Sequence, residues 1–240
     1  MRIAIVSDVH GNLAAFEAVV ADLKETSPDL ILHGGDLAHG GAHPVEVVDR
    51  IRELGWAGVC GNTDEMLWDS GVLSDFAAKA PQAQPILALV AEMIPSTCAR
   101  LGEDRIAWLK ALPRMQYCGP MALVHASPND LWRAPLPTAS DAELREVYGS
   151  LNAGVAVYGH IHQPYVRVLP TMTVANSGSV GLSYDGDPRA SYLLMDGERA
   201  TIRRVEYELE IELKTLLRSG LPHAEWIGRT LRAGRFVAPS

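Results

Sequence analysis

The chain has 240 residues, of which 48% are hydrophobic and 21% are charged, and its formal net charge is −8. This length favours one large domain over two, and such a domain can bury a sizeable core without disulfide bonds or structural metals. The acidic balance makes long nucleic acids unlikely partners, because proteins hold these polyanions largely through Lys and Arg.

The cysteines and the apolar stretches indicate the cellular compartment in which the protein is expected. Cys60, Cys98 and Cys118 are odd in number and lack C-x-x-C spacing, so we expect no disulfide framework. A strand pattern begins directly after Arg2, which leaves no room for a signal peptide. The longest apolar stretch, residues 85–95, is too short to span a bilayer and is interrupted by Glu92. We therefore expect a cytoplasmic protein without membrane association.

The first sixty residues predict alternating strands and helices. Residues 3–6, 30–32 and 57–59 are short apolar runs typical of buried strands. Between these runs, Asn12 can cap a helix, and residues 44–54 carry apolar side chains at helical spacing. A β-α-β-α-β series predicts a parallel sheet with right-handed crossovers.

The character of the chain changes between about residues 65 and 112. This stretch is rich in Ala and is broken at Pro81, Pro85 and Pro95. It predicts several helices and no clear strand. We interpret it as a helical insertion that shapes substrate access.

The second half predicts further strands and a helical tail. Residues 122–124 and 155–158 are again short apolar runs, and residues 165–169, 172–175, 192–195 and 201–207 suggest antiparallel hairpins. Two sheets packed face to face and covered by helices would accommodate both halves in a single α/β domain over residues 1–240. The tail, about residues 208–240, has five basic residues and one acidic residue from position 213 onward. We interpret it as a solvated helix face; the alternatives are phosphate binding or contact in a homo-oligomer.

Side chains that bind metals follow five of the predicted strands. They are Asp8, His10, Asp36, Asn62, His125, His160 and His162. Because the carboxyl ends of strands in an α/β sheet meet at one edge, we expect these side chains to converge there. Two carboxylates, one amide and four imidazoles suit borderline divalent metals. They are too many for one ion and about right for two ions that share a carboxylate.

The order and spacing of these blocks resemble the calcineurin-like metallophosphoesterases, from Met1 to about Tyr207. The blocks are Asp8-Val9-His10, Gly35-Asp36, Gly61-Asn62-Thr63-Asp64, His125 and Gly159-His160-Ile161-His162. Residues 176–181 and 185–190 look like the shorter bacterial and archaeal phosphodiesterase branch. The resemblance implies a four-layer α-β-β-α sandwich of two mixed sheets. It also implies that Asp8, His10 and His162 hold one metal, that Asn62, His125 and His160 hold the other, and that Asp36 bridges them.

The resemblance further implies a metal-dependent phosphoric ester hydrolase acting on a small phosphorylated substrate. The expected reaction is hydrolysis of phosphodiesters by in-line attack of a hydroxide that bridges two divalent ions. Mn²⁺ is the first expectation, and Fe, Ni, Co or Zn also suit these ligands. The expected catalytic residues are Asp36, Asn62, Thr63, Asp64 and His125, with Asp64 either orienting a ligand or capping a helix.

The chain departs from the usual family pattern at Thr63. Many relatives carry His there, where it is assigned to protonate the leaving oxygen, and a Thr hydroxyl has no proton that titrates near neutral pH. This favours diesters with good leaving groups or phosphoanhydrides over alkyl monoesters. His33 or His39 could supply the proton instead, or could be structural. The alternative functions are a dinucleoside polyphosphate or nucleotide pyrophosphohydrolase, with the insertion holding the base, and a metal-bound scaffold with little catalysis.

Overall fold

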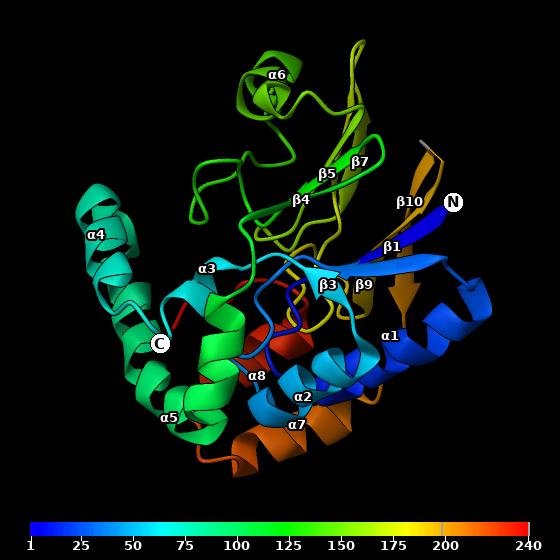
Figure 1. Ribbon diagram of the computed structural model, residues 1–240. Helices are drawn as coiled ribbons and strands as arrows, with labels where there is room; N and C mark the ends of the chain where they lie inside the picture. Colours follow the sequence, from blue (N-terminus) through cyan, green and yellow to red (C-terminus); the bar gives the residue numbers. More distant parts are fainter. Residues whose placement is uncertain (198, 240) are drawn as a thin grey trace.

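Two mixed five-stranded sheets form the centre of the computed structural model, which describes residues 1–197 and 199–239 (Figure 1). The first sheet has the order β10-β9-β1-β2-β3, and the second has the order β4-β5-β6-β8-β7. The strands of the first sheet are β1 (Arg2–Val6), β2 (Leu30–His33), β3 (Ala57–Gly58), β9 (Ala190–Asp196) and β10 (Arg199–Val205). Those of the second are β4 (Met115–Cys118), β5 (Met121–Val124), β6 (Val155–Tyr158), β7 (Tyr165–Val168) and β8 (Thr173–Asn176).

Helices cover the outer faces of both sheets (Figure 1). On the first sheet lie α1 (Leu13–Thr26) and α2 (Pro44–Leu54), with α7 (Leu209–Arg218) and α8 (Ala224–Ala233) beside them. On the second sheet lies α6 (Asp141–Tyr148), followed by a 3-10 turn at Gly149–Leu151. The fold is therefore the predicted α-β-β-α sandwich.

Strand alternation accounts for the two inner layers. In β1, Ile3 and Ile5 face the second sheet and pack with Leu123, whereas Ala4 and Val6 pack against the helices on the other side. Successive side chains of a strand point to opposite faces, so an uninterrupted apolar strand can be buried on both faces. The parallel pairing of β1 with β2 and of β2 with β3 confirms the predicted β-α-β-α-β series.

Local sequence signals define the two helices of this series. The Asn12 carboxamide oxygen accepts a hydrogen bond from Ala15 N at 3.0 Å, which caps α1 as predicted. Helix α2 begins with Pro44 and ends before Gly55, whose φ of 65° lies in the left-handed region. Proline at the start and glycine just past the end are the usual termini of a helix.

Two elements were not predicted. Strand β4 pairs antiparallel with β5, but Tyr117 is 56% exposed, so β4 lacks the apolar run by which the other strands were identified. Helix α6 begins at a capping box, in which Ser140 and Glu143 accept hydrogen bonds from each other's main-chain N–H. The S-x-x-E pattern of that box was a signal in the sequence that could have found the helix.

Residues 65–112 are mainly helical and contain no strand, as predicted. After the short α3 (Asn62–Glu65) come α4 (Gly71–Lys79), a 3-10 turn at Pro81–Ala83, and α5 (Gln84–Lys110). Helix α5 is two helices joined across a kink at Gly102, where φ is 71°. Figure 1 shows α4 and α5 flanking the two sheets on one side of the molecule.

The remaining expectations concern membranes and cysteines. Within residues 1–197 and 199–239, every helix is too short or too polar to cross a membrane. Cys60, Cys98 and Cys118 are all free thiols, which confirms that they form no disulfide framework.

Helix α7 buries a carboxylic acid against the start of α1. Glu212 is 2% exposed, and it accepts a hydrogen bond from the main chain of Ala14. Its Oε1 atom has no hydrogen-bond partner among the residues that the structure describes. Burial disfavours the ionised form and raises the pKa of Glu212 from 4.5 to about 7.

Glu212→Gln is expected to remove part of the pH dependence of stability. Because the pKa of Glu212 is higher in the folded chain, its contribution is fully present below the unfolded pKa of 4.5 and is lost as the pH rises through about 7. Urea unfolding measures the free energy of unfolding at pH 5 and at pH 8. Between these pH values it should fall further for the natural chain than for the Gln variant, by on the order of 2 kcal/mol. Equal losses would show that Glu212 ionises as easily in the folded chain as in the unfolded one.

Candidate metal centre

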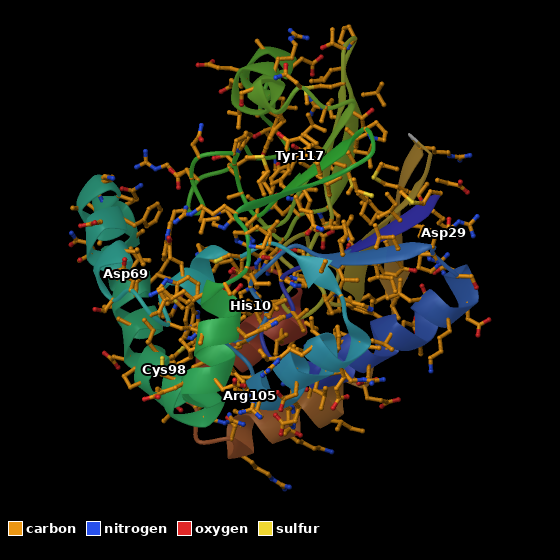
Figure 2. All side chains as sticks on the ribbon, viewed as in Figure 1. His10, Asp29, Asp69, Cys98, Arg105 and Tyr117 are labelled. Atoms are coloured by element: carbon orange, nitrogen blue, oxygen red, sulfur yellow. The ribbon has the colours of Figure 1, made fainter. Side chains whose placement is uncertain are left out.

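The predicted ligands all lie where strands end. Asp8 and His10 follow β1, Asp36 follows β2, Asn62 follows β3, His125 follows β5, and His160 and His162 follow β6. These are the carboxyl ends of the parallel strands of both sheets, the usual place for a site in an α/β fold. Figure 2 places His10 in the middle of the molecule, between α5 and the sheets.

Main-chain hydrogen bonds continue the strand pairing into these loops. Asp8 N donates to Gly35 O at 3.0 Å, and His10 N donates to Asp36 O at 3.0 Å, so the loops after β1 and β2 stay paired. In the second sheet, Gly159 N donates to His125 O at 2.9 Å. The loops are therefore held by the same kind of contact as the strands and can position side chains accurately.

Five of the seven candidate ligands have positive φ angles. They are Asp8 (56°), His10 (50°), Asp36 (55°), His160 (65°) and His162 (55°). A residue with a Cβ atom adopts this left-handed conformation only at a cost, and such residues gather at functional sites where the surroundings enforce them. The strain in these loops supports a functional origin for the cluster.

A first group of donor atoms contains His10, His162, Asp8 and Asp36. Ligand atoms of all four side chains lie within 4.8 Å of one another. His10 Nδ1–H donates to His39 O at 2.7 Å, and His162 Nδ1–H donates to Leu182 O at 2.5 Å. Because a carbonyl oxygen can only accept, each Nε2 atom carries a lone pair in the neutral ring.

The lone pairs of this group face one another. The two Nε2 atoms lie 3.2 Å apart, and His162 Nε2 lies 3.2 Å from Asp8 Oδ1. Acceptor atoms this close repel unless a proton or a cation lies between them. Imidazole nitrogens and carboxylate oxygens in this arrangement fit a divalent transition metal.

A second group of donor atoms contains Asn62, His125 and His160. His125 Nδ1–H donates to Gly34 O at 2.8 Å, and His160 Nε2–H donates to the carbonyl of Trp132 at 3.2 Å. The other ring nitrogens, His125 Nε2 and His160 Nδ1, lie 2.8 and 2.9 Å from Asn62 Oδ1. Three acceptor atoms again converge, and they too could hold a cation.

Asp36 lies between the two groups. Its Oδ2 atom is 3.7 Å from His10 Nε2 and 3.5 Å from His125 Nε2. Its Oδ1 atom accepts a hydrogen bond from Thr63 N at 2.8 Å, which fixes the orientation of the carboxylate. Asp36 is thus placed to serve both groups at once.

The electrostatics of the centre favour an ionised Asp8 and, at two histidines, neutral rings. Burial alone would raise the pKa of Asp8, but His162, His125 and His10 together hold it well below its usual range. Burial lowers the pKa of His10, with a contribution from His162, and lowers that of His160 to about 4. Ionised carboxylates and neutral imidazoles are the forms that bind metals.

His125 differs from these two histidines. Burial would lower its pKa, but the charges of Asp36 and Asp8 raise it above the usual value. The ring therefore lies in a region of negative potential, which favours either a proton on Nε2 or a cation beside it.

Asp64 does not face the donor groups. Its Oδ2 atom accepts hydrogen bonds from Asp36 N at 2.9 Å and Gly61 N at 3.0 Å, and its Oδ1 atom accepts one from Leu37 N at 3.1 Å. It thereby joins the loop of Asp36 to the start of α3. Gly61 is needed for this close approach, because a Cβ atom there would lie 2.0 Å from Asp36 Oδ1.

Thr63 donates through its main chain to Asp36, whereas its buried Oγ1 atom has no hydrogen-bond partner within residues 1–197 and 199–239. The two histidines considered as alternative acids are both buried. Burial lowers the pKa of His33 to about 4, and burial with the nearby His10 lowers that of His39 to about 3. Neither imidazole is protonated near neutral pH, which argues against either as the proton donor.

Three residues near the centre were missed from the sequence. Ser7 Oγ donates to Asp8 Oδ2 at 2.6 Å, and its position directly before the Asp-x-His motif was a usable signal. Trp132 accepts the His160 hydrogen bond, and its indole N–H donates to Glu65 Oε2 at 3.0 Å. Glu65 directly follows the Gly61-Asn62-Thr63-Asp64 block, which was a comparable signal. No motif marks Trp132, because its contact with Glu65 joins positions 67 residues apart.

Known proteins resemble this chain in sequence and in fold. Residues 1–200 match the model of the calcineurin-like phosphoesterase superfamily domain. An uncharacterized protein of Methanocaldococcus jannaschii is 29% identical over 97% of this chain and 98% of its own length. The crystal structure of a metallophosphoesterase from Sphaerobacter thermophilus has a TM-score of 0.78 and 29% identity, covering 98% of this chain and 100% of that one. A hypothetical protein of Pyrococcus horikoshii OT3 has a TM-score of 0.82 over 98% of this chain and 99% of its own, and at 18% identity it supports the fold alone.

Proposed function

The chain belongs to the calcineurin-like phosphoesterase superfamily, and from that membership we propose that it is a phosphodiesterase that uses two divalent cations, one in each donor group. Members of this family are metal-binding hydrolases of phosphoesters. We propose that the protein prefers diesters, that it holds two cations per chain and that Mn²⁺ is its native metal. We also propose a small phosphorylated substrate and a cytoplasmic location.

The convergence of acceptor atoms carries the proposal. His10 Nε2 and His162 Nε2 meet in one group, and His125 Nε2 and His160 Nδ1 meet at Asn62 Oδ1 in the other. In each group the opposite ring nitrogen donates to a carbonyl, so the tautomers direct lone pairs inward. Mixed nitrogen and oxygen donors suit Mn²⁺ and its neighbours among the divalent metals.

The charge of these side chains suits a phosphate substrate. Two bound divalent cations would lower the pKa of a water molecule and neutralise charge on the phosphoryl oxygens. Among the seven ligands only Asp8 and Asp36 are carboxylates, and Asn62 is neutral, so the loaded centre would keep a positive charge. That local charge attracts an anionic phosphate even though the whole chain is acidic.

The residues around the centre favour good leaving groups. Thr63 takes the position next to Asn62, and its hydroxyl cannot act as an acid near neutral pH. His33 and His39 are neutral there because burial lowers the pKa of each. A diester with an acidic leaving alcohol needs a proton least, so it is the preferred substrate class.

Cleavage of a dinucleoside polyphosphate is the second candidate function. A cavity of about 180 Å³ lies between α4 and the loop after β5. Its lining includes the rings of Phe76 and Trp132, the cations of Lys79 and Arg133, and the carboxylates of Glu65, Asp75 and Asp130. The two aromatic faces are the feature that favours this candidate, because aromatic side chains stack on nucleobases. Trp132 connects this cavity to the metal centre through His160.

Turnover of three substrates by metal-stripped and Mn²⁺-loaded protein tests the proposal. The substrates are an activated aryl diester, the matching monoester and a dinucleoside polyphosphate. We expect diester turnover that chelation abolishes and Mn²⁺ restores, with two ions per chain by elemental analysis. Anhydride cleavage alone would favour the second candidate. An absence of turnover with metals bound would indicate a scaffold, and one ion at saturation would refute the dinuclear centre.

A further inference from the structure

Glu65 joins the helical insertion to the loop that follows β5. It is the last residue of α3 and is 8% exposed. Its Oε2 atom accepts a hydrogen bond from Trp132 Nε1 at 3.0 Å, and its Oε1 atom is paired with the guanidinium of Arg114. The hydrogen bond from the indole N–H to a buried carboxylate oxygen is charge-assisted, so it restrains the position of the indole.

The contact continues from Trp132 to the metal centre. The main-chain carbonyl of Trp132 accepts the Nε2–H of His160 at 3.2 Å, and His160 Nδ1 lies 2.9 Å from Asn62 Oδ1. Asn62 is the first residue of α3, one helical turn before Glu65. The contacts therefore form a closed ring through Glu65, Trp132, His160 and Asn62.

The other donor group does not depend on this ring. His10 and His162 are oriented by the carbonyls of His39 and Leu182. His125, which belongs to the second group, is oriented by Gly34 O. Of the four imidazoles, His160 alone is held by the Trp132 carbonyl.

We propose that Glu65 is a positioning residue for one of the two metal positions. By fixing Trp132, it sets the tautomer and the ring orientation of His160, and so the affinity of the group formed by Asn62, His125 and His160. The inference rests on the proposed function in that it assumes a cation in this group. Partners that orient a ligand in this way typically contribute about 10–100-fold to metal affinity.

The chain offers a matched set of variants. Glu65→Ala removes the acceptor, and Trp132→Phe removes only the indole donor while keeping a ring to pack on Phe76, whose centroid is 5.2 Å away. Glu65→Gln keeps an acceptor oxygen for the indole but loses the charge. Arg114→Gln removes the other partner of the same carboxylate and serves as the control, since the Arg114 side chain is 58% exposed.

Mn²⁺ titration of the metal-stripped protein, followed by EPR, measures the two affinities separately. For Glu65→Ala and Trp132→Phe we expect the affinity of one ion to fall about 10–100-fold while that of the other stays unchanged. Glu65→Gln should restore much of the loss, and Arg114→Gln should resemble the natural chain. Glu65→Gln could bind Mn²⁺ as weakly as Glu65→Ala does while Trp132→Phe binds Mn²⁺ with the natural affinity. In that case the charge of Glu65 sets the affinity, and the positioning role is wrong. If Glu65→Ala does not fold, Trp132→Phe and Glu65→Gln decide the question.

A readout without metal separates this inference from the proposed function. Two-bond ¹H–¹⁵N NMR spectra of the stripped protein should show His160 as a single Nε2–H tautomer in the natural chain and in Arg114→Gln. We expect a mixture of tautomers in Glu65→Ala. If the natural chain binds only one ion, the dinuclear proposal is wrong. The comparison of His160 tautomers still tests the positioning role of Glu65 in that case. Two ions bound with unchanged affinities in every variant, together with an unchanged tautomer, would overturn the inference.

Discussion

Asp36→Asn is expected to abolish turnover more completely than His162→Ala. Asp36 Oδ2 lies 3.7 Å from His10 Nε2 and 3.5 Å from His125 Nε2, so one carboxylate serves both donor groups. The Asn side chain has the same shape, but its oxygen would be taken by the Thr63 N–H and its NH₂ would face the cations. Losing one preorganised electrostatic group costs about 10²–10³-fold in kcat, and Asp36 should reach or exceed that range.

The measurements are kcat on an aryl diester and bound metal per chain, with circular dichroism to confirm folding. His162→Ala should lose metal from one group only. Asp29→Asn is the matched control, because Asp29 precedes β2 and Asp36 follows it, and Figure 2 shows Asp29 far from His10. A folded Asp36→Asn variant that keeps most of its turnover would show that the carboxylate does not bridge the groups.

Thr63→His is expected to raise turnover of alkyl phosphomonoesters far more than turnover of an activated aryl diester. An alkoxide leaves poorly without a proton, whereas an aryl oxide leaves readily, and general acid assistance typically contributes about 10²–10⁴-fold. The prediction assumes that the side chain of position 63 faces the phosphate, since Thr63 follows Asn62 directly and its N–H contacts Asp36. The ratio of the two kcat/KM values is the measurement.

Thr63→Val is the control for this change. The Thr63 Oγ1 atom is buried without a hydrogen-bond partner among the described residues, so an isosteric Val should preserve the fold and both rates. An unchanged ratio in folded, metal-loaded Thr63→His would mean that position 63 faces away from the phosphate or that another group already supplies the proton. Adding His39→Ala and His33→Ala to the same assay separates these two outcomes.

Local signals made the first half of the fold predictable. Pro44 and Gly55 define the ends of α2, Asn12 caps α1, and the apolar run of β1 is buried on both faces. Strand β4 was not predicted because none of its residues is fully buried and Tyr117 is exposed, so its sequence has no apolar run. Its position depends on pairing with β5, a tertiary contact that overrides a weak local preference.

The sequence predicted which side chains converge at the candidate site but not how they are oriented. The ends of the predicted strands indicated the converging side chains, because parallel strands align their carboxyl ends. Which ring nitrogen of each histidine faces inward depends on a carbonyl from a distant segment, such as Leu182 for His162 or Trp132 for His160. The burial of His33 and His39, which lowers the pKa of each, is likewise a product of packing by other elements.

The central place of β1 in its sheet has a consequence for synthesis of the chain. One neighbour, β2, comprises residues 30–33 and is synthesised soon after β1. The other neighbour, β9, comprises residues 190–196 and is synthesised near the end of the chain. At translation rates of about 5–20 residues per second, one edge of β1 stays unpaired for roughly 10–40 s. An unpaired strand edge of Ile, Ala and Val can pair with another chain. Nascent chains crowded on one messenger RNA are therefore exposed to self-association at β1 until β9 leaves the ribosome.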